Sequence, residues 1–298
     1  MMPTYKFRKI KKSDKDELIK IVSKIWEGND FIPYCFDEWQ KDKKGEFTAI
    51  EFNGKLIGCA KMTFLTDTDV WLQGLRKDID LELKGVGSAL SQYFVDKLSK
   101  QKGVTSIRFA THCRNLASVT ANEKVGFRVA QRLTIKRLAV NPDDVNKSLA
   151  KKVVRITNPK MALNFIRKSG YYKAAGNNIN IGWIVYPYSE NVLREKFINP
   201  GMCFGVMKDD ELTGLVMALP GKSLKIAFLD AVNKPTAKKL IEHVKTMALD
   251  NEGSMIAAYL PEYYPVRRWF DELGFEGGEE QPEFLIYEYP LDKLKKKK

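Results

Sequence analysis

The stretch WLQGLRKDIDLELKGVGSAL, residues 71–90, joins a strand pattern to a helix pattern through a pair of glycines. Its first residues form an apolar run of the kind that builds strands. The helix pattern follows Gly87 and repeats apolar residues along one side, at Leu90, Phe94 and Leu98. A strand that runs through a loop into a helix is the unit of sheets covered by helices, so this stretch indicates a mixed fold.

The residues before this stretch extend the same arrangement. Residues 5–10 alternate like a half-buried strand, and a helix with a capping Asp14 follows. Residues 31–39 are aromatic-rich and are interpreted as a loop. The turn Asn53-Gly54 between two apolar runs predicts a hairpin.

The residues after it complete a sheet. We expect a strand at 104–110, a helix at 116–124 that ends at Gly126, and strands at 127–129 and 133–138. The order of the elements predicts an α/β (α+β) fold, in which a mixed, mostly antiparallel twisted sheet is flanked by helices.

Some of these patterns return in the second half. The hairpin that begins at Phe47 has a counterpart at Phe204, and the segment that ends at Phe127 has one that ends at Phe275. Similar spacing predicts a duplicated fold, with domains at 1–142 and 143–298. The second half carries no glycine pair between its corresponding strand and helix, so we expect that copy to have lost the loop.

Length and composition narrow the class of protein. The 298 residues suit two domains, and neither a secretory signal nor an apolar run of membrane-spanning length is visible. We therefore expect a cytoplasmic protein without a membrane partner. The four cysteines are scattered and only two histidines are present, which predicts reduced thiols and no metal site.

The formal net charge of +13 favours an anionic partner. Nucleic acid, an acidic surface and a phosphorylated cofactor all fit this charge, and a solvated lysine-rich surface explains it as well. No nucleic-acid-binding module is recognisable, so a nucleic-acid partner is the less favoured of these.

The loop Gly85-Val86-Gly87 is the candidate ligand site. Glycines allow the backbone to approach a ligand, and the free N–H groups at a helix start, with the helix dipole, suit a pyrophosphate. Arg76, Lys77 and Lys84 could add positive charge. The dinucleotide fingerprint and the Walker loop are both incomplete here, and a tight turn without a ligand remains the alternative.

Three segments resemble the GNAT acetyltransferase superfamily. Residues 75–90 resemble its acetyl-CoA-binding motif, and the segment from Asn115 to Phe127 resembles its later Asn…Glu-Lys-x-Gly-Phe segment. Residues 7–14 resemble its first strand and helix. Within the superfamily, residues 30–39 and 71–76 are similar to the histidine N-acetyltransferase-like group, which points to small amine substrates.

The resemblance implies two tandem GNAT-like domains, of which the first binds acetyl-CoA and the second is degenerate. It also implies the cofactor contacts. Strand residues would pair with pantetheine, loop backbone would hold the pyrophosphate, and an asparagine would lie near the pantetheine arm. In that order, these residues are Leu75, Arg76 and Lys77; then Leu83, Lys84, Gly85, Val86, Gly87 and Ser88; then Asn115.

The sequence departs from the family pattern at three places. Glu82 stands where the family has Arg or Gln, Asn122 stands where it has the tyrosine that protonates the leaving thiolate, and Gln73 stands where the histidine-acetylating group has an acid. The proton donor and acceptor are therefore open. His112 is the candidate base, with Gln73 and Glu51 as further candidates, and water relays as the alternative.

The function that these observations imply is transfer of an acetyl group from acetyl-CoA to a primary amine of a small molecule such as an amino acid. The alternatives are a peptide or protein N-acetyltransferase and a non-catalytic protein that binds CoA or nucleic acid. We expect a monomer or a homodimer. The acceptor would meet aromatic side chains, although core packing is an alternative for them, at Phe31, Tyr34, Trp39 and Trp71.

Overall fold

The structure is a computed structural model that describes residues 4–221, 223–250, 254–278 and 283–291. The chain forms two compact units. Unit 1 comprises residues 1–129 and 286–298, and unit 2 comprises residues 130–285.

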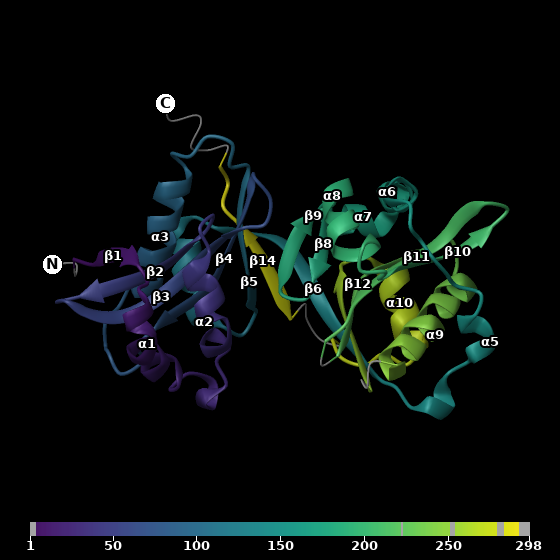
Figure 1. Ribbon diagram of the computed structural model, residues 1–298, viewed down its shortest axis with the longest axis horizontal. Coiled ribbons are helices and arrows are strands. Elements are labelled where there is room, and N and C mark those ends of the chain that lie inside the picture. The colour runs from purple at the N-terminus through teal and green to yellow at the C-terminus, as the bar shows by residue number, and fades with distance from the viewer. Residues whose placement is uncertain (1–3, 222, 251–253, 279–282, 292–298) are drawn as a thin grey trace. The chain divides into compact units, whose positions relative to one another are not determined.

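Unit 1 is a sheet with helices on both faces (Figure 1). Its strands lie in the order β1-β2-β3-β4-β5-β14. The strands are β1 (Lys6–Lys9), β2 (Glu46–Phe52), β3 (Lys55–Phe64), β4 (Asp69–Lys77), β5 (Ser106–His112) and β14 (Phe284–Glu288), and the helices are α1 (Lys15–Val22), α2 (Ile32–Lys41), α3 (Val86–Leu98) and α4 (Leu116–Val125).

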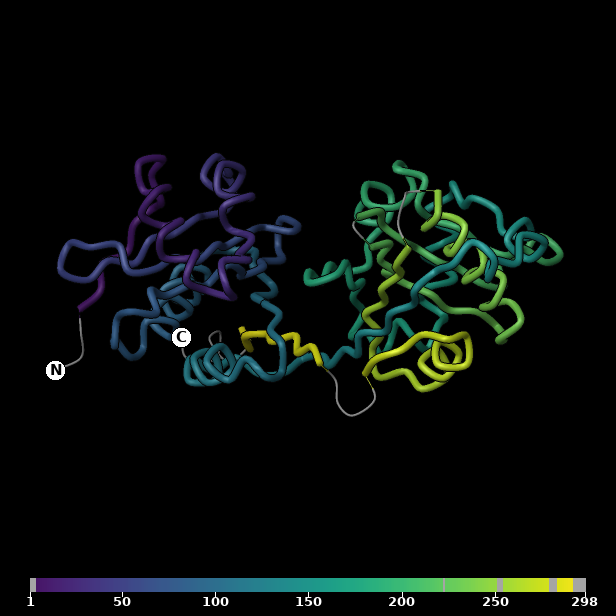
Figure 2. Tube along the Cα trace, turned by 90° about the horizontal axis from the view of Figure 1, so that it is seen from below, coloured from purple at the N-terminus to yellow at the C-terminus, as the bar shows by residue number. Residues whose placement is uncertain are grey.

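Alternation of side chains assigns each helix of unit 1 to one face of the sheet. Phe47, Ala49 and Cys59 point to the face where α1 and α2 bury their apolar residues. Glu46 points to the other face, where Tyr93 of α3 donates a hydrogen bond to it at 2.8 Å. Figure 2 shows the same arrangement edge-on, with the first two helices and α3 on opposite sides.

The prediction of a loop at residues 31–39 was wrong, because α2 covers Ile32–Lys41. Pro33 lies at the start of this helix, where its missing N–H costs nothing. Ile32, Phe36 and Trp39 are buried, and their spacing places them on one side of the helix. The many aromatic residues in this stretch made its short amphipathic helix pattern hard to recognise in the sequence.

Unit 2 repeats the strand arrangement, in the order β7-β10-β11-β12-β13-β6. Strands β10, β11 and β12 are paired antiparallel, and β12 is then paired parallel with β13. In unit 1 the parallel pair at the corresponding place is β4–β5. Its strands are β6 (Arg128–Ala139), β7 (Val154–Arg155), β10 (Cys203–Lys208), β11 (Glu211–Leu219), β12 (Leu224–Ala231) and β13 (Met255–Pro261), with a separate hairpin of β8 (Asn178–Ile181) and β9 (Ile184–Pro187).

Unit 2 also contains α-helices of different lengths. The α-helices are α5 (Lys147–Ala150), α6 (Pro159–Lys168), α7 (Gly170–Ala174), α8 (Glu190–Leu193), α9 (Lys234–Asp250) and α10 (Tyr264–Glu272). The longest of them, α9, follows the parallel strand β12, as α3 follows β4 in unit 1.

The units divide the chain differently from the predicted boundary after residue 142. The last seven residues of β6 pair with β13 of unit 2, from Leu133 to Ala139. Unit 1 instead takes its last strand from the C-terminal segment, where Tyr289 N donates to Ile107 O at 2.9 Å. The strand next to β5 in the sheet is therefore β14, from the end of the chain, and not β6, which follows α4 in sequence.

No helix in the described residues is both long and apolar enough to span a membrane. Within the same ranges, no group of three His, Cys, Asp or Glu side chains is arranged to hold a metal ion. The thiols of all four cysteines are free.

Candidate functional site

Strands β4 and β5 begin as a parallel pair and then part. Three residue pairs join them, from Asp69↔Ser106 to Trp71↔Arg108. Both strands continue past the last pair, β4 to Lys77 and β5 to His112. The second half of β4 therefore has a backbone edge that β5 does not pair with, and such an edge can accept a ligand that hydrogen-bonds as a strand does.

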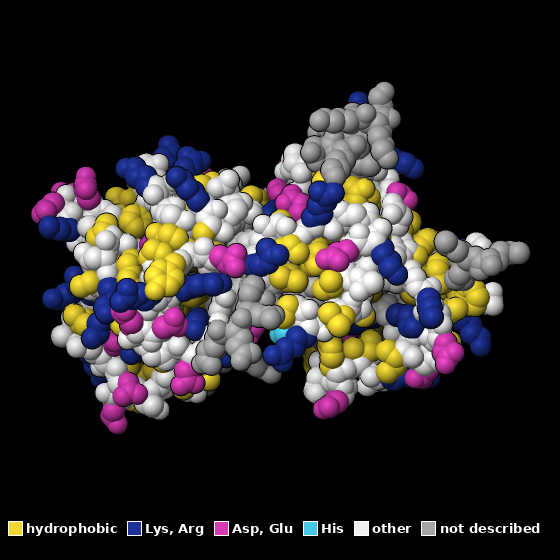
Figure 3. All heavy atoms as spheres, turned by 180° about the vertical axis from the view of Figure 1, so that it is seen from behind, with side chains coloured by type: hydrophobic (Ala, Val, Ile, Leu, Met, Phe, Trp, Pro, Cys, Tyr) yellow, Lys and Arg dark blue, Asp and Glu magenta, His cyan; other side chains and the backbone are white. Residues whose placement is uncertain are grey.

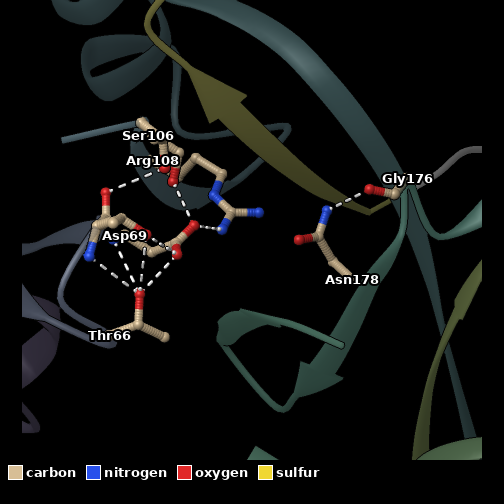
Figure 4. A network of polar contacts seen from close by, with 8 residues as sticks. Thr66, Asp69, Ser106, Arg108, Gly176 and Asn178 are labelled. Carbon is tan, nitrogen blue, oxygen red and sulfur yellow. Dashed lines mark hydrogen bonds and ion pairs between the residues drawn. The ribbon is translucent and has the colours of Figure 1, made fainter. Parts of the chain in front are cut away.

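A carboxylate fastens the closed end of this split (Figure 4). Asp69 accepts hydrogen bonds from Ser106 Oγ at 2.8 Å, from Arg108 Nη2 at 3.0 Å and from Thr66 Oγ1 at 2.6 Å. Burial by itself raises the pKa of Asp69, but these hydrogen bonds and the Arg108 charge outweigh it and hold the pKa below its usual value. The strands are thus joined at one end and separate at the other.

Gly74 marks the bulge at which β4 changes direction. The register of β4 against β3 shifts here, and Gly74 has a φ of +64°. A Cβ at this position would lie 2.6 Å from Trp39 Cζ3. Glycine is needed both for the left-handed backbone and for the close approach of the tryptophan. The bulge sets the direction of Leu75 and the residues after it.

The start of α3 presents free donors beside this strand. Gly85 is the N-cap residue, with a φ of +83°, and the first intrahelical bond runs from Ala89 N to Gly85 O at 2.9 Å. The N–H groups of Val86, Gly87 and Ser88 precede that bond and have no intrahelical acceptor. A Cβ built on Gly85 would meet no atom within 4 Å, so side chains do not block the loop.

The two glycines of the loop have different roles. A Cβ added at Gly87 would lie 3.2 Å from Ala121 Cβ and 3.5 Å from Leu75 Cδ2. Gly87 therefore allows α3 to pack closely against α4 and β4, whereas Gly85 supplies the left-handed turn. This packing places the start of α3 next to the unpaired part of β4.

Two residues that are predicted to contact the cofactor through their backbone use their side chains to organise the loop. Lys77 Nζ donates to Leu81 O at 2.6 Å and to Leu83 O at 3.0 Å, and Ser88 Oγ donates to Ala121 O at 2.8 Å. These side chains are occupied, so a ligand at this loop would be held by backbone N–H groups. Lys84 and Glu82 are exposed, which leaves the acidic side chain free to point into solvent.

Asn115 and Asn122 both have structural partners on α4. Asn115 caps the helix, and its Oδ1 accepts from Ser118 N at 3.2 Å. Asn122 is buried, with Ser91 Oγ donating to its Oδ1 at 2.7 Å and its own Nδ2 donating to Ser118 O at 2.8 Å. A side-chain amide has no acidic proton, so Asn122 cannot act as a proton donor.

His112 ends β5 and has a defined tautomer in its neutral form. The backbone N–H of Arg114 donates to His112 Nδ1 at 3.1 Å. Because Nδ1 accepts this hydrogen bond, the neutral ring carries its proton on Nε2. In this arrangement Nε2 is a donor, which is not the protonation state that a general base requires.

Gln73 and Glu51 occupy different parts of the sheet. Gln73 lies on β4 directly before the bulge, and its Nε2 donates to Thr63 Oγ1 at 3.1 Å. Glu51 lies near the far end of β2, where its carboxylate pairs with Arg8 Nε at 2.5 Å. The structure therefore brings Gln73 to the split between the strands and leaves Glu51 two strands away from it.

The predicted acceptor aromatics also separate. Trp71 and Trp39 are buried, Phe31 is partly exposed and packs edge-on against Trp39, and Tyr34 is 91% exposed. The sequence interpretation missed Trp26, whose ring centroid lies 4.3 Å from Arg76 Cζ. Trp26 begins a single 3-10 turn after α1, where no periodic pattern marks it. Only the fold could therefore reveal this contact.

A hollow of about 570 Å³ lies elsewhere in unit 1. Its lining comes from the end of α2 and the start of β2 and includes Trp39, Asp42 and Phe47. None of the residues of the 78–88 loop lines it. The split of β4 and β5, and not this hollow, has the backbone donors that suit a phosphorylated ligand.

The corresponding helix start in unit 2 is already capped. Strands β12 and β13 also pair over three residues and no further, ending at Ile226↔Ala258. At the start of α9, however, Asn233 Oδ1 accepts from Thr236 N at 3.0 Å, and Pro235 has no N–H to offer. Of the three backbone positions before the first intrahelical bond, from Ala237 N to Asn233 O, one therefore lacks an N–H group and one has its N–H group capped.

Comparisons with known proteins agree with this geometry. Residues 15–127 match the sequence model of the acetyltransferase (GNAT) family. A GCN5-related N-acetyltransferase from Sphaerobacter thermophilus has a similar fold, with a TM-score of 0.65, 10% identity and coverage of 98% of this chain and 97% of that one. Another from Kribbella flavida gives a TM-score of 0.55 at 14% identity, covering 97% and 73%. No curated protein matches the sequence significantly.

Proposed function

We propose that this chain, a GNAT-type acyl-CoA-dependent N-acyltransferase, transfers an acetyl group from acetyl-CoA to a primary amine of a small molecule. One observation carries the proposal. The unpaired edge of β4 beyond Trp71 lies beside the uncapped start of α3, so strand-like backbone groups and anion-binding N–H groups occur side by side. Pantetheine and pyrophosphate need these two kinds of groups in this order.

The residues present fit such a cofactor. The N–H groups of Val86, Gly87 and Ser88 would hold the pyrophosphate, and the main chain of β4 after Gly74 would pair with the pantetheine amides. Acyl-CoA supplies a thioester whose carbonyl carbon the amine attacks. Leu75 contributes its N–H more readily than its carbonyl, because Arg76 Nη1 already donates to that carbonyl at 2.8 Å.

Proton transfer in this proposal relies on water and on one histidine. An alkylammonium must lose a proton before its lone pair can attack. Glu51 is paired with Arg8, and Gln73 cannot accept a proton, so water takes that proton. His112 contributes Nε2–H as a hydrogen-bond donor to the negative charge that develops on the departing sulfur or on the carbonyl oxygen.

Binding and turnover should be measured separately. Isothermal titration with acetyl-CoA tests the cofactor site, and release of the CoA thiol in the presence of amino acids and peptides tests the reaction. We expect binding, and faster thiol release with free amino acids than with peptides. Absence of acetyl-CoA binding would remove the basis of the proposal, and binding without turnover on any amine would favour a non-catalytic CoA-binding protein.

His112→Asn tests the proposed donor. Asparagine keeps an acceptor for the Arg114 N–H but removes the group at Nε2. We expect kcat to fall by about 100-fold, the lower range for loss of an acid–base or donor group, while the acetyl-CoA Kd stays unchanged. A fall of less than about threefold would show that His112 has only its turn-stabilising role.

The alternative of a nucleic-acid-binding protein finds no support on the visible surface. On the face shown in Figure 3, lysine and arginine side chains are interspersed with acidic ones. A protein that follows a phosphate backbone presents a continuous basic stripe or patch.

Other predictions from the sequence remain predictions. These are the tandem duplication with a degenerate second domain, the similarity to the histidine N-acetyltransferase-like group, a cytoplasmic location, and a monomeric or homodimeric state. The capped start of α9 supports the loss of cofactor binding in unit 2.

A further inference from the structure

Arg76 lies in a buried, aromatic environment on the face of unit 1 that carries α1 and α2. Its guanidinium is 5.3 Å from the Phe31 ring centroid and 4.3 Å from that of Trp26. Nε donates to Asp30 Oδ2 at 2.5 Å, and Nη1 donates to Leu75 O at 2.8 Å. Only 10% of the Arg76 side chain is exposed.

The third nitrogen of this guanidinium has no acceptor. Arg76 Nη2 is buried and makes no hydrogen bond to any of the described residues. A buried N–H group of a charged side chain without an acceptor is costly, so such a group in a folded protein calls for an explanation. The aromatic rings offset part of the charge but accept no conventional hydrogen bond.

The aromatic residue nearest the guanidinium carbon, Trp26, has an unusual backbone conformation. Trp26 is 54% exposed, although it packs on the guanidinium. Both Trp26 and Glu27 have positive φ, at 49° and 56°. Bulky residues rarely adopt this backbone region, and where they do, the strain is often associated with a ligand-binding segment. Trp26 thus packs on the guanidinium with a strained backbone and a largely exposed side chain.

We propose that Arg76 binds the carboxylate of the acceptor, so that the substrate is an amino acid with a free carboxylate, with Trp26 displaced or repositioned on binding. This inference rests on the proposed function, because it places the acceptor beside the acyl group at β4. Nη2 and the second hydrogen of Nη1 form a planar pair that matches the two oxygens of a carboxylate.

A carboxylate fits this site better than a phosphate does. Asp30 is 1% exposed and already neutralises much of the Arg76 charge. A ligand group with two negative charges would be repelled by the Asp30 carboxylate more strongly than a group with one, and a carboxylate has two oxygens that can accept from the edge of the guanidinium. Asp30 also accepts from Ile32 N at 2.9 Å, which fixes it at the start of α2. It thereby acts as a positioning residue for Arg76.

The test uses acetyl-CoA and the full chain. It compares each common L-amino acid as acceptor with the derivative in which the α-carboxylate is an amide. For each amino acid that the enzyme acetylates, we expect kcat/KM to be at least about tenfold higher for the acid than for the amide. Arg76→Lys keeps a cation for Asp30 but lacks the second N–H₂ group. Arg76→Lys should raise KM for the acid. It should also bring the kcat/KM values of the acid and the amide to within about threefold of each other.

Arg268→Lys is the matched control, because Arg268 is an exposed arginine that pairs with Glu272 in unit 2. It should leave the preference for the acid unchanged. If Arg76→Lys does not fold, Trp26→Ala replaces it: removing the ring that packs on the guanidinium should change KM for the acid and not for the amide. Equal KM changes for both acceptors would overturn the inference.

The outcomes separate the inference from the proposed function. If the wild-type chain acetylates acids and amides equally well, the carboxylate site is refuted and the acetyltransferase remains. If the amides or peptides are the better acceptors, the same conclusion holds and a peptide substrate is favoured. If acetyl-CoA neither binds nor turns over, the proposed function fails and this inference fails with it.

Discussion

Gly85→Asp is expected to raise the Kd for acetyl-CoA by about 100-fold, which corresponds to about 2.7 kcal/mol. The substitution places a carboxylate beside the N–H groups of Val86, Gly87 and Ser88, where the pyrophosphate would lie. That carboxylate repels the ligand and competes for the same donors. Isothermal titration with acetyl-CoA measures the change.

Gly85→Asn is the matched control for this variant. Asparagine has nearly the same shape and tolerates the left-handed backbone of Gly85, but it brings no charge. We expect Gly85→Asn to raise the Kd for acetyl-CoA by less than about tenfold. Both variants should keep the wild-type circular dichroism spectrum, because Asn and Asp are both favourable at the N-cap of a helix. Unchanged affinity in Gly85→Asp would show that the loop does not bind the cofactor.

Gly74→Ala is expected to destabilise the protein by about 3 kcal/mol and to weaken acetyl-CoA binding as well. The added Cβ would meet Trp39 at 2.6 Å, and this ring is fixed by edge-on contacts with Phe31 and Phe47. The strand can avoid the clash only by changing the bulge, which moves the Leu75 edge. Urea denaturation and calorimetry measure the two effects.

Gly54→Ala separates the clash from the cost of the backbone conformation. Gly54 also has a positive φ, but a Cβ there would meet no atom within 4 Å. We expect this control to lose only about 1 kcal/mol, with unchanged acetyl-CoA affinity. If Gly74→Ala is no worse than Gly54→Ala in both measurements, Trp39 does not set the geometry of the bulge.

Much of unit 1 could be predicted because its signals are local. The hairpin turn at Asn53-Gly54 has the positive φ at both residues that this pair favours. The glycine loop before α3 and the glycine that ends α4 at Gly126 are likewise where the sequence predicted them. Each of these depends on the conformational freedom of one residue or on a short apolar period, and both are visible in the sequence.

The candidate site was only partly predictable, because its polar residues are defined by distant partners. Lys77 and Ser88 are predicted to contact the cofactor through their backbone, but the sequence does not show that their side chains hold the loop and α4 in place. Glu51 was a candidate base and is paired with Arg8. Nothing in the sequence around these residues shows which neighbour will take a given hydrogen bond.

The sequence by itself determined the strand–loop–helix segment and the open turn at Gly85, because backbone conformation follows from residue type over a few positions. Tertiary structure alone decided which strand completes each sheet and how Asp30 and Trp26 enclose Arg76. These contacts join residues far apart in the chain, and their energies depend on burial and geometry that exist only once the chain has folded.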